Sequence, residues 1–292
     1  MNENDVLAQQ FETHRRHLRA VAYRMLGSLT EAEDAVQESW LRLSRTDTDS
    51  VENLGGWLTT IVARVCLNML QSRRSRREEP LDVQVPDPIV TLSDGSYPEQ
   101  EAVLADSVGL ALLVVLGTLT PSERLAFVLH DMFAVPFEDI APIVERSPAA
   151  ARQLASRARR RLQGAPVPDT DPVRQRAVVD AFLAAARGGD FDALVAVLDP
   201  DVVLRADTGA LPAGASTMVR GAETVAGRVL GYARLARFAQ PALVNGAAGV
   251  VAISEGQLLS VMGVTIRQGT IVEIDILADR ERLAGLLVEN LD

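Results

Sequence analysis

Lysine is absent from this 292-residue chain, whose 29 basic residues are all arginine, and cysteine occurs once, at Cys66. A single cysteine excludes an intrachain disulfide, and the opening MNENDVLAQQF has neither the basic start nor the apolar core of a signal peptide. The longest apolar run, residues 108–119, is shorter than the about 20 residues that a membrane-spanning helix needs. We therefore expect a cytoplasmic protein with no membrane partner, and a buried helix at the apolar run.

Aromatic residues are also scarce, at 4%, but a hydrophobic content of 48% is ample for folded cores. The net charge is −10, yet the stretch SPAAARQLASRARRRL at 147–162 contains five arginines. An acidic total does not exclude DNA binding, because a contact depends on the charge within a Debye length of about 8–10 Å.

The arginine-rich stretch is predicted to be a helix capped by Ser147, with Pro148 in its first turn. The preceding segment PFEDIAPIVER predicts a shorter helix, and the pair is typical of a helix-turn-helix. Arg and Gln can pair with purine edges, and Arg neutralises phosphates, so DNA binding is favoured over a merely solvated charged face. The predicted inward stripe is Ala151, Leu154, Ala155, Ala158 and Leu162, and the opposite face holds Ala149, Arg152, Gln153, Ser156 and Arg160.

The chain divides into three predicted folded blocks. Helical patterns cover residues 5–77 and 101–163, and proline-rich connectors follow at 78–100 and 164–172. From residue 173 to 292 one helical pattern precedes alternating strand patterns, with a further helix at 221–238. The fold class is therefore multidomain, with two all-α blocks, the second containing the helix-turn-helix, followed by an α+β domain.

The first block contains LTEAEDAVQESWLRL, where Thr30 and Glu33 predict a capping box. Asp34, Gln37, Glu38 and Leu41 share one face of this helix. Taken alone, these acids are explained most simply as complementing the helix dipole.

A longer helix follows, with Trp57, Leu58, Ile61, Val62 and Val65 predicted to face inward. The combination of a polar ridge and terminal arginines suits a nucleic-acid backbone. The ridge comprises Thr60, Arg64, Asn68 and Gln71, and the arginines are Arg73, Arg74, Arg76 and Arg77.

The segments LGSLTEAEDAVQESWLRL, GWLTTIVARVCLNML and TPSERLAFVLHDMFAVPFEDIAPIVERSPAAARQLASRARRRL, in this order, resemble an extracytoplasmic-function (ECF) sigma factor of bacterial RNA polymerase. The C-terminal part, with GDFDAL and LDPDVV, resembles a fused SnoaL-like (NTF2-like) cone domain. The resemblance covers essentially the whole chain. It implies sigma region 2 at 5–77, a linker at 78–100, region 4 at 101–163, a second linker at 164–172 and the SnoaL-like domain at 173–292.

The resemblance also implies partners and roles. The partners are core RNA polymerase, at the clamp of its largest subunit and at its flap region, and promoter DNA. Clamp binding would fall to Asp34, Gln37, Glu38 and Leu41; minus-ten recognition to Trp57, Thr60, Arg64, Asn68, Arg73 and Arg74; and minus-thirty-five recognition to Arg152, Gln153, Ser156, Arg157 and Arg160.

Three motifs of the subgroup are altered in this chain. The linker motif LPEPVV corresponds to VPDPIV with Pro86 and Pro88, DGGGK to DTGAL with Asp207 and Gly209, and NPDKL to ADRERL. The resemblance suggests that the domain rests against the first block and the linker and so sets the separation of the two DNA-reading blocks. Pro86, Pro88, Asp207 and Gly209 are the residues expected in this regulatory contact. The alternative for Asp207 is a polar turn residue after a strand.

Enzyme activity is not favoured. The C-terminal domain has no His or Cys, and its candidate cavity acids, Asp207, Asp275 and Asp279, have no obvious catalytic partner. No metal motif or phosphate-binding loop appears, so no cofactor is expected, and a small-molecule ligand of the domain is left open. The rival function is a one-component helix-turn-helix regulator with a sensor domain, which would not need the first block.

Overall fold

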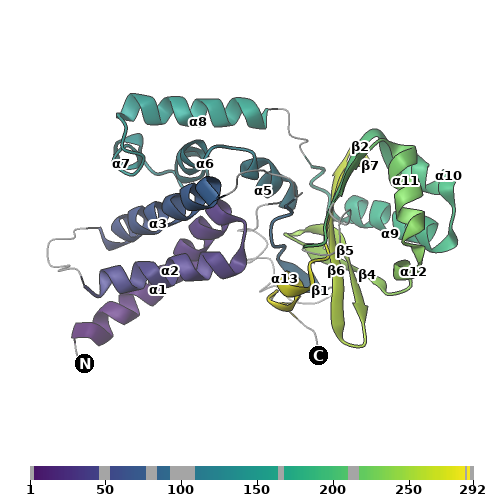
Figure 1. Ribbon diagram of the computed structural model, residues 1–292, viewed down its shortest axis with the longest axis horizontal. Helices are drawn as coiled ribbons and strands as arrows, with labels where there is room; N and C mark the ends of the chain where they lie inside the picture. The colour runs from purple at the N-terminus through teal and green to yellow at the C-terminus, as the bar shows by residue number, and fades with distance from the viewer. Residues whose placement is uncertain are drawn as a thin grey trace. The chain divides into compact units, whose positions relative to one another are not determined.

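The structure is a computed structural model, and it describes residues 3–45, 53–76, 84–92, 109–163, 168–209, 217–286 and 288–289. The chain forms two compact units (Figure 1). Unit 1 comprises Met1–Pro80 and Val115–Gly164, and unit 2 comprises Leu81–Val114 and Ala165–Asp292. The described part of the first linker, residues 84–92, thus belongs to the unit that contains the C-terminal domain.

The first block of unit 1 is a three-helix arrangement, drawn in purple and blue in Figure 1. The capping box expected at Thr30 and Glu33 is wrong. The N-cap is Ser28, whose Oγ accepts a hydrogen bond from the Glu31 N–H at 3.4 Å. Gly27, at φ 70°, follows the last residue of α1, and α2 begins at Leu29, so Thr30 already lies inside the first turn. The helices are α1 (Glu3–Leu26), α2 (Leu29–Leu43) and α3 (Leu54–Arg76).

The second block contains the predicted helix-turn-helix. Ser147 caps the arginine-rich helix by accepting a hydrogen bond from the Ala150 N–H, and Pro148 is its first residue, as predicted. The helix before it is shorter than expected, because only Phe137–Ile140 is helical and a turn continues to residue 146. The elements are α6 (Pro121–Phe127), η1 (Val128–Met132), α7 (Phe137–Ile140) and α8 (Pro148–Leu162). They are preceded by α5 (Leu110–Gly117), whose residues up to Val114 belong to unit 2.

The apolar run at 108–119 forms α5, as expected, but the helix is buried on one side only. Leu110, Leu113 and Leu116 are buried, and the residues between them are partly exposed. A spacing of three places these leucines on one face.

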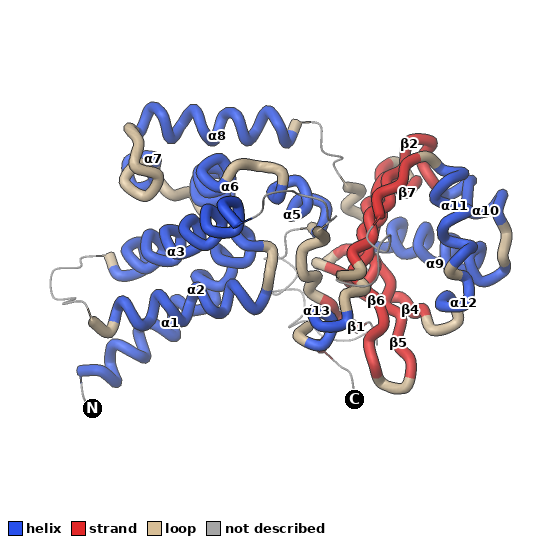
Figure 2. The backbone as a smooth tube through the Cα atoms, viewed as in Figure 1, coloured by secondary structure: helices blue, strands red, loops and turns tan. Residues whose placement is uncertain are grey.

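Unit 2 is built on one mixed sheet in the order β3-β2-β7-β6-β5-β4-β1-β8, shown in red in Figure 2. Successive hairpins join β4 to β7, and the residue before each turn glycine has positive φ: Asn245, Glu255 and Gln268. Paired positive φ values are typical of tight hairpin turns. The strands are β1 (Val90–Leu92), β2 (Leu198–Asp207), β3 (Thr217–Arg220), β4 (Ala239–Val244), β5 (Ala247–Ser254), β6 (Gln257–Arg267), β7 (Thr270–Leu277) and β8 (Val288–Glu289).

The helices of unit 2 are α9 (Pro172–Gly188), α10 (Phe191–Val197), α11 (Ala222–Gly231), α12 (Ala233–Ala236) and α13 (Arg280–Ala284). The helix expected at 221–238 is two helices, interrupted at Tyr232. Helices α9 to α12 pack on one face of this sheet, whereas Leu283 of α13 packs into the core on the other face, and this arrangement confirms the α+β class.

The two faces of the sheet have separate cores. The core under α9–α11 contains Leu204 and Ile274, whereas the opposite core contains Leu277 together with Val85 and Val90 of the first linker. Since side chains alternate along a strand, Asp207 and Asp275 point away from the helical layer. The expectation that these two acids line the interior of the cone is therefore wrong, and Asp279 is the N-cap of α13.

Candidate nucleic-acid interface

The predicted reading face of α8 is open to solvent. Arg152, Gln153, Arg157 and Arg160 are exposed, and Ser156 is half-buried. The guanidinium of Arg152 lies 5.2 Å from the ring centroid of Phe137, which orients it over the start of the helix-turn-helix. Ala151, Ala155 and Ala158 are fully buried on the opposite side, as the periodicity predicts.

Two arginines of α8 are occupied inside unit 1. Arg159 donates to Asp131 at 2.6 Å, and Arg161 donates to the buried carboxylate of Glu123 at 2.9 Å. These ion pairs fix the back of α8 and leave the other arginines for a partner.

The polar ridge of α3 is present, although its members differ in exposure. Arg64 and Asn68 are exposed, Thr60 and Trp57 are partly buried, and Arg64 donates a long hydrogen bond of 3.4 Å to the carbonyl of Pro142. The ridge therefore faces outward along most of its length.

Arg73 and Arg74 follow the ridge but have different environments. Arg73 is ion-paired with Glu31 and donates to the carbonyl of Leu26, so it ties α3 to the turn between α1 and α2. Arg74 is exposed. The Arg76 side chain and Arg77 lie outside the described residues.

The acidic face of α2 is also as predicted. Asp34 and Gln37 are exposed, and Leu41 is 41% exposed. Glu38 forms an ion pair with Arg42 at 2.9 Å. A groove of about 390 Å³ runs beside this face between α1 and α2, lined by Ala8, Phe11, Glu12, Arg15, Glu33, Val36, Gln37 and Trp40.

Sequence reasoning missed Arg124, which joins the two helical blocks inside unit 1. Its Nε donates to the carbonyl of Arg24 at 3.1 Å, and burial lowers the pKa of its guanidinium to about 10. Arg24 in turn lies over the ring of Phe133 at 4.9 Å. The same site raises the pKa of Cys66 to about 12, chiefly by desolvation, so this thiol is not a nucleophile. A lone arginine in an apolar pattern gave no signal of this role.

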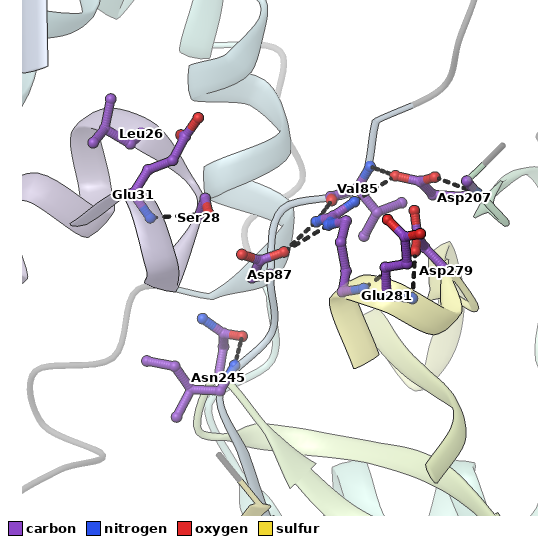
Figure 3. A network of polar contacts seen from close by, with 12 residues as sticks. Leu26, Ser28, Glu31, Val85, Asp87, Asp207, Asn245, Asp279 and Glu281 are labelled. Atoms are coloured by element: carbon purple, nitrogen blue, oxygen red, sulfur yellow. Dashed lines mark hydrogen bonds and ion pairs between the residues drawn. The ribbon is translucent and has the colours of Figure 1, made fainter. Parts of the chain in front are cut away.

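The expected contact between the first linker and the C-terminal domain lies within unit 2 (Figure 3). Asp207 Oδ2 accepts from the Val85 N–H at 3.0 Å and from Arg282 at 2.7 Å. Arg282 also donates to Asp87 at 2.8 Å and to the carbonyl of Val85 at 2.6 Å. We call Val85, Asp87, Asp207 and Arg282 the linker clamp.

The residues predicted from the sequence to form the regulatory contact lie around the linker clamp. Pro88 is buried, Pro86 is half-buried, and Gly209 donates its N–H to Asp207 at 3.2 Å. Gly209 has φ 66°, and a Cβ there would collide with Asp279, so two requirements favour glycine. Asp207 is itself buried at the end of β2 and is not a surface turn residue. The sequence marked these segments, but not Asp87 or Arg282.

Beside the clamp, a buried ion cluster occupies the same face of the sheet. Arg205 donates to Asp275 and to Glu273, each at 2.9 Å. Burial raises the pKa of Asp275 to about 6, although Arg205 acts in the opposite direction. Burial by itself lowers the pKa of Arg205, but the two carboxylates outweigh it and raise that pKa. Both acids are thus held by one arginine.

Among the described residues, no group of three or more His, Cys, Asp and Glu could hold a metal ion. In the same residues no helix is long and apolar enough to cross a membrane.

Comparison with known proteins identifies the two helical blocks. The family description Sigma-70 region 2 matches residues 10–76, and Sigma-70, region 4 matches residues 109–162. The first match contains α2 and α3, and the second contains α8.

Relatives extend over the whole chain. The ECF RNA polymerase sigma factor SigJ of Mycobacterium tuberculosis is 38% identical, over 94% of this chain and 93% of its own. The probable ECF RNA polymerase sigma factor SigI of the same organism is 34% identical over 99% of each chain. The crystal structure of SigJ superimposes with a TM-score of 0.75, at 36% identity, over 96% of this chain and 99% of that chain.

Proposed function

The chain belongs to the ECF sigma factors of bacterial RNA polymerase, a non-enzymatic family that directs transcription initiation, and we propose how its surfaces divide that task. Core RNA polymerase and promoter DNA are the partners that the family implies. The assignment of each partner to a surface, the control by the C-terminal domain and a cytoplasmic location are the proposal.

Polymerase docking is assigned to α2. Leu41 supplies an exposed apolar contact, and Asp34, Gln37 and Glu38 surround it with acceptors on the same face. We assign this face to the clamp helices of the largest subunit, and the second helical block to the flap region.

Promoter reading is divided between α3 and α8. The exposed Arg152, Gln153 and Arg157 at the start of α8 can donate to purine edges of the minus-thirty-five element. The ridge of Thr60, Arg64 and Asn68, with Trp57 and Arg74 at its ends, is assigned to unstacked bases of the minus-ten element. Arg73 supports this ridge through Glu31.

The C-terminal domain is proposed to control initiation by holding the first linker. The observation that carries this proposal is the linker clamp, in which Arg282 bridges Asp87 and Asp207 while Asp207 also accepts from Val85. Strand β1, which is part of the same linker, also pairs antiparallel with β4 of the C-terminal domain. Because this linker separates regions 2 and 4, fixing it limits the positions that the two promoter-reading helices can adopt together.

Run-off transcription with purified core polymerase tests the division of labour. Wild-type protein is expected to direct one promoter-specific transcript that core polymerase alone does not make. Leu41→Ala should lower core binding, and Arg157→Gln should lower promoter selection without loss of core binding. A protein that binds a specific DNA site but never associates with core polymerase would instead support the one-component regulator.

A further inference from the structure

We propose that a second DNA-binding surface lies on the C-terminal domain, at α12 and its neighbours, and that it contacts the phosphate backbone of promoter DNA upstream of the minus-thirty-five element. We call this surface the α12 patch. That the DNA is a promoter rests on the proposed function. The patch comprises Arg187, Arg228, Tyr232, Arg234, Leu235 and Arg237.

The charge of the patch is opposite to that of the chain. Residues 224–254 contain three arginines and no Asp or Glu, in a protein of net charge −10. Within the described part of the chain, none of Arg187, Arg228, Arg234 and Arg237 is ion-paired with a carboxylate. By contrast, Arg176, Arg205 and Arg282 of the same unit all have acidic partners. The patch is therefore a local cationic site.

Aromatic rings hold two of these arginines in place. Arg228 lies over Tyr232 at 5.7 Å from the ring centroid, and Arg237 lies over Phe238 at 4.4 Å. Arg228 is half-buried and donates one N–H to Thr217 Oγ1 at 3.3 Å. A guanidinium stacked on a ring keeps its remaining N–H edges available, and those edges match phosphate oxygens. The stacking also reduces the side-chain entropy that is lost when a partner binds.

Hydrogen bonds connect the elements that carry the patch. Arg187, at the end of α9, donates to the carbonyl of Ala236 at 3.2 Å and to that of Ala239, which fixes α12 against α9. The Leu235 N–H donates to the carbonyl of Tyr232 at 2.8 Å, so the turn between α11 and α12 is closed. Arg234 and Arg237 are both exposed on this support. A rigid support favours ordered phosphate contacts.

The composition favours DNA over an acidic protein. A protein interface usually has a buried apolar centre, whereas the exposed apolar residues of the patch are only Leu235, at 42%, and Tyr232, at 55%. Along the chain, only residues 164–167 separate Gln163, the C-cap of α8, from residue 168, where the described part of the C-terminal domain begins. Any DNA that α8 binds therefore brings the C-terminal domain to the same promoter.

The test measures binding of the complete holoenzyme, core polymerase with full-length protein, to two promoter fragments. One ends at the minus-thirty-five element and the other continues upstream by about two helical turns, roughly 20 base pairs. Fluorescence anisotropy is recorded across a range of KCl concentrations. The test variant is Arg234→Gln with Arg237→Gln. The matched control, Arg174→Gln with Arg280→Gln, removes the same charge from exposed arginines elsewhere on the domain.

On the long fragment, the test variant should bind about threefold to tenfold more weakly than wild type, with a salt slope reduced by about 1 to 2. On the short fragment, wild type, test variant and control should bind alike, which also reports correct folding. Equal binding of wild type and test variant to the long fragment would overturn the proposal. An equal loss on both fragments would also overturn it and would indicate an acidic protein surface on polymerase. If wild-type holoenzyme fails to select the short promoter fragment, the sigma assignment itself fails, and that outcome is distinct from the other two.

Discussion

Val85 and Asp207 are 122 residues apart in the chain, yet the Val85 N–H donates to the Asp207 carboxylate at 3.0 Å. The bond fixes the first linker to the end of β2, and Arg282 bonds to both partners. A segment that would otherwise be a free connector is therefore part of the fold of unit 2. We propose that this attachment couples the C-terminal domain to the spacing of the two helices to which promoter reading is assigned.

Removing the clamp arginine should release the linker. Arg282→Gln leaves the buried carboxylates of Asp87 and Asp207 without their cation, at a cost of about 2–4 kcal/mol. Hydrogen exchange at the amides of Val85 and Val90 is expected to accelerate. Arg280→Gln changes an exposed residue of the same helix and should leave this exchange as in wild type. Slow exchange in both variants would show that β1 pairing alone holds the linker.

Promoter discrimination should depend on the outer arginines of α8. Arg157→Gln is expected to reduce affinity for a minus-thirty-five site by about 1–3 kcal/mol, because one base or phosphate contact is lost. Arg159→Gln is the control, since Arg159 is paired with Asp131 on the other side of the helix. Gel-shift titration with matched and mutated sites measures the difference. The same loss for both variants would contradict the assigned face.

Polymerase affinity should depend on the outer face of α2. Leu41→Ala removes an exposed apolar side chain, so the fold should tolerate it while core binding weakens about tenfold, the scale of a residue worth more than 1 kcal/mol in an interface. Glu33→Gln is the matched control, because Glu33 pairs with Arg15 on the neighbouring surface. Fluorescence titration of labelled protein with core polymerase reports both. Unchanged affinity of Leu41→Ala would place the docking surface elsewhere.

The buried cluster predicts a pH effect on stability. Burial raises the pKa of Asp275 from 3.8 to about 6, so the folded state binds more protons than the unfolded state between these values. The contribution of this group to stability must then fall as pH rises through that window. Compared with Asp275→Asn, wild type should lose free energy of unfolding from about pH 4 to about pH 7. The free energy of unfolding is measured by urea denaturation at each pH. If it changes with pH in the same way for wild type and Asp275→Asn, Arg205 fully offsets the effect of burial on the pKa of Asp275.

Local patterns predicted much of the fold. The Ser147 cap, the alanine stripe of α8 and the alternating strands depend on neighbours within a few residues, and these predictions are confirmed. The cap of α2 was placed wrongly, because Thr30 and Ser28 both precede acidic residues at the required spacing. The glycine that ends α1 decides between them.

Predictions for the sites were limited by contacts between distant segments. The proline-rich linker and ADRERL were recognised as motifs, but no local rule pairs Asp87 with Arg282, which are 195 residues apart. The direction of Asp275 also required the strand register, since a shift of one residue moves a side chain to the other face. Arg124 is similar, because its partner Arg24 is 100 residues away.

Run-off transcription by holoenzyme carrying wild type, Arg282→Gln or Arg280→Gln tests the central claim most directly, namely that the C-terminal domain controls initiation through the linker clamp. We predict a specific transcript from wild type, the same yield from Arg280→Gln, and a yield changed by about twofold or more in Arg282→Gln, as expected when an ordered linker is released. This account would be contradicted if all three proteins gave equal yields although hydrogen exchange at Val85 and Val90 showed that the linker is released in Arg282→Gln.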